Sequence, residues 1–74
     1  MSTKDISDRQ VCAAYAAMEH LHETAEVILQ YQTGQPEKVC WRAMERACRR
    51  DLIDYGTNLR YGWLTEKGRA LLDL

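Results

Sequence analysis

Two histidines and three cysteines are the residues of this chain best suited to bind a metal ion. Structural zinc sites usually have ligands in close pairs, such as two cysteines separated by two residues. Here Cys40 and Cys48 are eight positions apart, and only His20 and His22 are close to each other. We therefore expect no metal, with small buried thiols and exposed histidines instead.

No other set of residues forms a pattern typical of catalysis. The sequence contains no nucleophile paired with a base, no glycine-rich phosphate loop and no suggestive pair of carboxylates. We expect neither an enzyme nor a bound cofactor, and no small-molecule substrate.

Charge is distributed unevenly along the chain, although the formal net charge is only -1. Residues 1 to 34 contain two basic and five acidic side chains, whereas residues 38 to 60 contain six basic and three acidic ones. The molecule is therefore polarised, with its basic side in the second half, while its global charge predicts no partner.

The length and composition predict a single small domain. A chain of 74 residues has a marginal core, so a dimer contact or a partner would add stability. The start has no apolar core of a secretory signal, and the longest apolar run is far below the roughly 18 residues of a membrane span. With three cysteines, an odd number, we expect reduced thiols and a soluble, cytoplasmic protein.

Three helices are predicted in the first two thirds of the chain. Ser7 and Gln10 form a capping-box pattern before a helix over residues 8 to 20. Thr24 precedes a second helix of about two turns that stops at Gly34, and Pro36 suits the first position of a third helix ending near residue 50. One side of the third helix is apolar and the other is charged.

The last third predicts a hairpin and a closing helix. Residues 52 to 55 and 59 to 64 are expected as two strands on either side of the turn "GTN". Thr65 is expected to cap a fourth helix, in which Ala70, Leu71 and Leu74 pack on the core. Gly68 in that helix indicates close approach to a neighbouring backbone.

This order of elements resembles the winged helix-turn-helix domains of small bacterial and phage regulators. The similarity is strongest in "RACRRDLIDYG" and "GWLTEKGRALL", where such regulators leave the third helix, form the hairpin wing and cap the last helix. It implies an α+β fold, mostly α, with a flexible N-terminus over residues 1 to 6 and one winged-helix domain over residues 7 to 74. Asp51 departs from the family, in which many members have glycine at this point.

The resemblance implies a transcriptional regulator of phage or prophage type that binds double-stranded DNA. In this family the third helix enters the major groove and the wing contacts the flanking backbone. Arginine can read guanine or bind phosphate, and glutamine can pair with adenine. The implied DNA-binding residues are Gln35, Lys38, Arg42, Glu45, Arg46, Arg49, Asn58 and Arg60.

An alternative function is a winged-helix module that binds a protein, such as a host factor, without binding DNA. Glu45 would repel phosphate from the middle of the charged face, and the low net charge is unusual for a DNA-binding protein. Exposed aromatic side chains could anchor a protein partner or a homodimer. The candidates for this interface are Trp41, Tyr61 and Trp63, with Trp41 expected as a boundary residue that packs on neighbouring elements.

Overall fold

The computed structural model of the chain describes residues 6 to 73. Four helices and a two-stranded antiparallel sheet confirm the predicted α+β class, mostly α. In chain order the elements are α1 (Asp8–Leu21), α2 (Ala25–Thr33), α3 (Glu37–Arg49), β1 (Ile53–Asp54), the 3-10 turn η1 (Leu59–Tyr61), β2 (Trp63–Leu64) and α4 (Glu66–Leu71).

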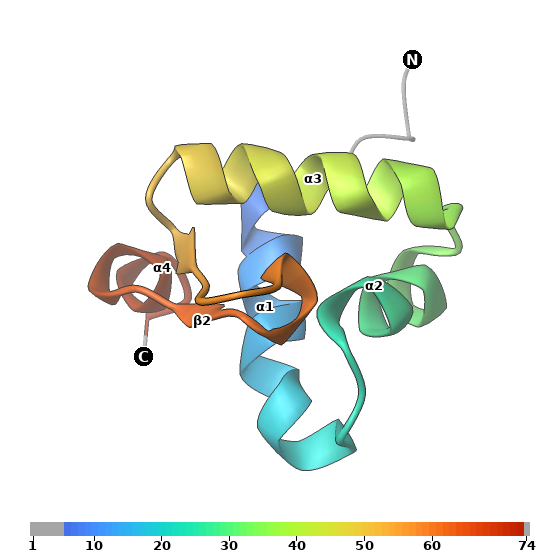
Figure 1. The fold of residues 1–74 in the computed structure, drawn as a ribbon, viewed down its shortest axis with the longest axis horizontal. Coiled ribbons are helices and arrows are strands. Elements are labelled where there is room, and N and C mark those ends of the chain that lie inside the picture. Colours follow the sequence, from blue (N-terminus) through green and yellow to red (C-terminus); the bar gives the residue numbers. More distant parts are fainter. Residues whose placement is uncertain (1–5, 74) are drawn as a thin grey trace.

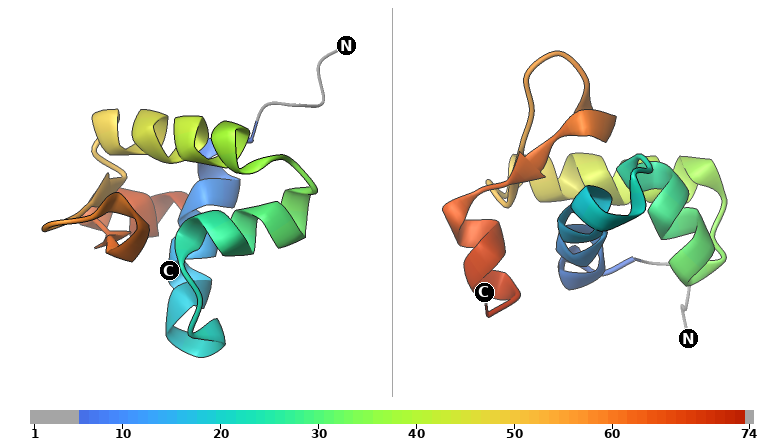
Figure 2. Two further views of the ribbon diagram at one scale, coloured as in Figure 1. Left: turned by 45° about the vertical axis from the view of Figure 1, so that its right-hand side comes forward. Right: turned by 90° about the horizontal axis from the view of Figure 1, so that it is seen from below.

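The helices α1, α2 and α3 all contact one another and enclose the core. α3 crosses above α1, while α4 and the strands lie on the side of α1 away from α2 (Figure 1). The segment that joins β1 to β2 projects from the body of the molecule (Figure 2). Only one side of α3 is therefore covered by the other helices, because its long axis runs along the edge of the fold.

α1 begins with the predicted capping box. The Gln10 amide N–H donates to Ser7 Oγ over 3.1 Å, and the Ser7 amide N–H donates to Gln10 Oε1 over 2.8 Å. The helix runs one residue beyond the predicted end and closes at His22, whose φ of 55° is left-handed. Val11 and Tyr15 on its inner face are buried.

Ile6, the first residue that the structure describes, is part of the core. Ile6 was expected in a flexible N-terminus, but its side chain is only 2 % exposed and belongs to the core. Its carbonyl oxygen also accepts a hydrogen bond from the Arg46 guanidinium. Residues 1 to 5 lie outside the described residues.

A glycine turn connects α2 to α3, as the sequence predicts. Gly34 has a φ of 72° and its amide N–H donates to the Gln30 carbonyl, which ends α2. The prediction for Pro36 was off by one position, because it precedes the helix as the N-cap, with an extended ψ of 159°. Its carbonyl accepts hydrogen bonds from Val39 and Cys40.

The chain leaves α3 through Asp51, whose φ of 63° is in the left-handed region, as expected for the residue that ends this helix. The Leu52 amide N–H then donates to the Ala47 carbonyl over 3.0 Å, and Leu52 and Ile53 are buried. Aspartate adopts the left-handed conformation at some cost in free energy, whereas glycine adopts it without that cost. The departure from the family pattern at this position therefore leaves the helix end intact.

The hairpin is shorter than predicted. The two strands pair Ile53 with Leu64 and Asp54 with Trp63, and residues 59 to 61 form η1 instead of a returning strand. Two features of Leu59 explain the difference. Its side chain is buried, and its carbonyl oxygen accepts a 2.7 Å hydrogen bond from the Tyr15 hydroxyl. These contacts draw the chain inward toward α1 before it can extend.

The Thr65 side chain caps α4, as predicted, by accepting from the Gly68 amide N–H over 3.1 Å. The prediction for Gly68 is confirmed too, since a Cβ there would lie 2.2 Å from the Leu52 carbonyl oxygen. The predicted packing face was wrong, because Ala70 and Leu71 are exposed and Leu72 packs on the core instead. Leu74 lies outside the described residues.

Candidate nucleic-acid interface

The solvent face of α3 is a row of charged side chains. Cys40, Ala43, Met44 and Ala47 are buried on one side of the helix, which confirms the predicted apolar face. On the other side Lys38, Arg42, Glu45 and Arg49 are all exposed. We call these four residues the α3 stripe. At 1.5 Å per residue a helix of 13 residues is about 20 Å long, so the stripe extends along most of one edge of the molecule.

The basic residues of the α3 stripe have no acidic partner in the described part of the chain. The ion pairs found among residues 6 to 73 involve Arg46, Arg50 and Arg60, and none of them involves Lys38, Arg42 or Arg49. The stripe therefore presents three positive charges and one negative charge, that of Glu45, to solvent. Such a surface can bind an anionic partner without first breaking an internal contact.

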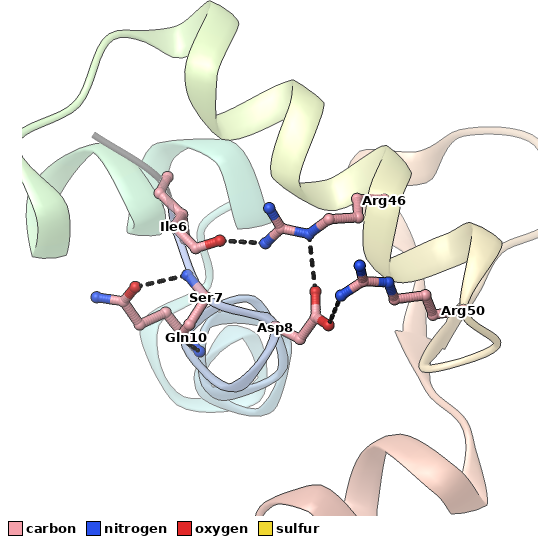
Figure 3. A network of polar contacts seen from close by, with 6 residues as sticks. All are labelled: Ile6, Ser7, Asp8, Gln10, Arg46 and Arg50. Atoms are coloured by element: carbon pink, nitrogen blue, oxygen red, sulfur yellow. Dashed lines mark hydrogen bonds and ion pairs between the residues drawn. The ribbon is translucent and has the colours of Figure 1, made fainter. Parts of the chain in front are cut away.

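Arg46, in contrast, is used inside the protein (Figure 3). Its Nε donates to Asp8 Oδ1 over 2.9 Å, and its Nη2 donates to the Ile6 carbonyl. Arg50 binds the other oxygen of the same carboxylate. Asp8, at the start of α1, therefore holds the Arg46 guanidinium against the first turn of that helix, so Arg46 does not belong to the free charged side of α3.

The environment of Asp8 favours its charged form. Burial acts to raise the pKa of its carboxyl group, but hydrogen bonds from Arg50 and Arg46, together with their positive charge, outweigh burial. The pKa is therefore lowered from its ordinary value of 3.8. Asp8 stays ionised at neutral pH and neutralises part of the basic segment.

Arg60 also differs from its predicted role on the wing. Its Nη2 lies 3.4 Å from Oε2 of Glu26, whose side chain is 5 % exposed, and its guanidinium carbon lies 5.6 Å from the centroid of the Trp41 ring. Arg60 therefore points into the protein, and its ion pair with Glu26 ties the projecting segment to α2. A buried carboxylate requires such a partner, which is the physical reason for the inward orientation.

Asn58 is the predicted wing residue that stays exposed. Its side-chain oxygen accepts a hydrogen bond from the Arg60 backbone N–H over 3.1 Å, so it caps η1. Its amide nitrogen can still donate to an external group. Asn58 is thus exposed in the projecting segment, whereas the Arg60 guanidinium is bound to Glu26.

Gln35 lies in the turn before α3 and is partly exposed. The backbone N–H of Gln35 donates to Thr33 Oγ1 over 3.2 Å. No side-chain cap covers the start of α3, because the side chain of its N-cap residue, Pro36, has no hydrogen-bond acceptor. The first N–H groups of the helix are consequently available to an external acceptor.

The three aromatic candidates lie in two different environments. Trp41 is partly buried against the core, and its Nε1 donates to Glu37 Oε2 over 3.2 Å, which confirms the predicted boundary position. Tyr61 and Trp63 are 64 % and 52 % exposed. These two side chains are available for contact with another molecule.

Within residues 6 to 73 no group of three potential metal ligands occurs, and no helix is long and apolar enough to cross a membrane. Cys12 and Cys40 are buried, Cys48 is partly buried, and all three are free thiols. Burial raises the pKa of the Cys12 and Cys40 thiols, so both keep their protons at neutral pH.

The two carboxylates that form internal ion pairs were not identified from the sequence. Asp8 binds Arg46 and Arg50, and Glu26 binds Arg60. Glu26 lies next to Ala25 and near Ile28 and Leu29 on a short apolar helix, and a carboxylate in such a position indicates a buried ion pair. Asp8 gave a weaker signal, because acidic residues in a first turn are common without any tertiary partner.

Comparison with protein-family models, curated proteins and solved structures finds no match to this chain.

Proposed function

We propose that this chain is a small winged helix-turn-helix protein that binds double-stranded DNA and regulates transcription, of the phage or prophage type. The observation that carries the proposal is the α3 stripe, in which Lys38, Arg42 and Arg49 are exposed and unpaired within the described residues. An exposed helix at the edge of a small domain fits the major groove of DNA, where arginine can bind guanine or phosphate.

The order of elements supports the same proposal. α2 is followed by a left-handed glycine turn, the longer α3 and a hairpin, which is the order of elements that the proposed winged helix-turn-helix domain requires. With α3 in the major groove, the exposed side chain of Asn58 in the projecting segment would contact the flanking backbone. The uncapped start of α3 would receive a phosphate.

The first test is binding of the purified chain to double-stranded fragments from its own genomic neighbourhood over a series of salt concentrations. Affinity should fall steeply with salt, because each phosphate contact releases counterions. If no fragment binds, or if binding does not depend on salt, the proposal fails.

An alternative is a winged-helix module that binds a protein, and the exposure of Tyr61 and Trp63 favours it. This alternative predicts a stoichiometric protein partner in a pull-down from bacterial lysate that survives nuclease treatment. Substitution of Arg42 or Arg49 would then leave capture of the partner unchanged.

A further inference from the structure

One ion pair lies where α2, α3 and the projecting segment meet. Arg60 Nη2 lies 3.4 Å from Glu26 Oε2 of α2, and the Arg60 guanidinium lies over the Trp41 ring of α3, 5.6 Å from its centroid. Trp41 follows Lys38 by three positions and precedes Glu45 by four, which are the spacings of neighbouring side chains on a helix. Arg60 is therefore next to the α3 stripe.

The contact between Glu26 and Arg60 leaves two polar atoms unpaired. Glu26 Oε1 and Arg60 Nε are both buried, and neither has a hydrogen-bond partner among residues 6 to 73. The distance of 3.4 Å is also long for a charged hydrogen bond, which is usually about 2.7 to 2.9 Å. Burial of charged groups costs free energy, and only good geometry with complete hydrogen bonding offsets that cost. Glu26 therefore binds Arg60 more weakly than an optimal buried pair would.

Arg60 is the outer member of this pair and can move without its backbone. Its side chain is 36 % exposed, whereas that of Glu26 is 5 % exposed. The backbone is fixed independently, because Leu59 is buried and its carbonyl oxygen accepts the hydrogen bond from Tyr15. The guanidinium can therefore leave Glu26 by side-chain rotation while the projecting segment keeps its position. Water would then take its place at the Glu26 carboxylate.

We infer that the contact between Glu26 and Arg60 is autoinhibitory: in the free chain Glu26 withholds Arg60 from DNA, and a phosphate replaces Glu26 when DNA binds. Arginine can bind a phosphate with two parallel hydrogen bonds, whereas here it meets a single oxygen of Glu26. The released guanidinium would add a fourth positive charge to the three of the α3 stripe. This inference rests on the proposed function, because it describes how one further phosphate contact of that surface is controlled.

The test is a double-mutant cycle, measured as affinity for one DNA fragment that the wild type binds. Glu26→Gln should tighten binding about fivefold, because an amide holds the guanidinium less strongly than a carboxylate does. In an Arg60→Gln background the same substitution should change affinity by less than about twofold, since no guanidinium is left to release. A purely structural role of the ion pair predicts the opposite sign, with weaker binding by Glu26→Gln.

Two controls separate the release of Arg60 from a general effect of charge. Glu23→Gln removes the same charge from an exposed side chain that has no ion pair in the described residues, and it should change affinity by less than about twofold in both backgrounds. Arg60→Gln should lower the salt slope of binding by about 1, whereas Arg60→Lys keeps the positive charge and should retain the slope.

Circular dichroism at the assay temperature checks that each variant is folded. Glu26→Asp keeps the charge but shortens the side chain by one methylene group, so it should also tighten binding. This variant replaces Glu26→Gln in the cycle if Glu26→Gln does not fold.

Two results would overturn the inference and leave the proposed function standing. One is weaker binding by the Glu26 variant, or an equal gain with and without Arg60. The other is an unchanged salt slope of Arg60→Gln, since Arg60 would then contact no phosphate. Absence of salt-dependent DNA binding by the wild type would overturn the proposed function and the inference together.

Discussion

Arg46 Nε lies 2.9 Å from Asp8 Oδ1, and this pair joins the middle of α3 to the first turn of α1. The same carboxylate also binds Arg50 (Figure 3). Two of the five basic residues of the segment 38 to 50 therefore stabilise the orientation of α3 instead of facing a partner. The remaining three, Lys38, Arg42 and Arg49, form the basic part of the α3 stripe.

We predict that Asp8→Asn lowers the free energy of unfolding by about 1 to 2 kcal/mol, because it removes both charged hydrogen bonds to the arginines. Urea denaturation measures this change. Glu23→Gln is the matched control, since Glu23 is exposed and has no ion pair in the described residues. Equal stability of the two variants would contradict the role assigned to Asp8.

The contribution of Asp8 should also depend on pH. Its pKa in the folded protein is lower than the ordinary value of 3.8, so the stabilisation is fully present above about pH 4. The stabilisation should disappear as the pH falls through the pKa of Asp8 in the folded protein, because the carboxyl group is then protonated in both the folded and the unfolded state. The difference in stability between wild type and Asp8→Asn should therefore shrink below pH 4. A difference that stays constant down to pH 2 would contradict this.

Gly68 and Gly56 provide a comparison of two glycine positions. Gly68→Ala should destabilise the protein by roughly 2 kcal/mol or more, because the new Cβ would lie 2.2 Å from the Leu52 carbonyl oxygen. Gly56→Ala should have little effect, since a Cβ added there would have no atom within 4 Å apart from its chain neighbours. Thermal unfolding of both variants checks the pair, and similar melting temperatures would show that α4 does not pack as described.

The ion pair between Glu26 and Arg60 should stabilise the attachment of the projecting segment to α2. Glu26→Gln should lower the free energy of unfolding by about 1 to 3 kcal/mol, because the partly buried Arg60 guanidinium loses its counter-charge. Glu45→Gln, an exposed change of the same kind, should be neutral within about 0.5 kcal/mol. Denaturant titrations that rank the two variants in the opposite order would exclude this link.

Much of the fold follows from local signals in the sequence. The capping box of Ser7, the glycine turn at Gly34, the left-handed Asp51 and the Thr65 cap each depend on residues within a few positions of one another. Local interactions of this kind can be recognised without knowing the rest of the structure. The boundaries of α1 and α2 were therefore predicted to within one residue.

The errors occur where distant residues interact. The returning strand was predicted too long because the hydrogen bond between Tyr15 and the Leu59 carbonyl spans 44 positions. The internal ion pairs of Arg46 and Arg60 were not foreseen because their partners, Asp8 and Glu26, lie on other helices. Helical periodicity identifies the polar side of α3, but it cannot show which polar groups are bound internally.

The most direct test of the DNA-binding proposal compares the affinities of two double variants for one DNA fragment that the wild type binds, measured at several salt concentrations. Arg42→Ala with Arg49→Ala should weaken binding and reduce the salt slope by about 2, one for each lost phosphate contact. Arg9→Ala with Lys67→Ala removes two exposed charges outside α3 and should leave the slope nearly unchanged. Equal slopes for the two double variants would contradict the assignment of the α3 stripe as the DNA-binding surface.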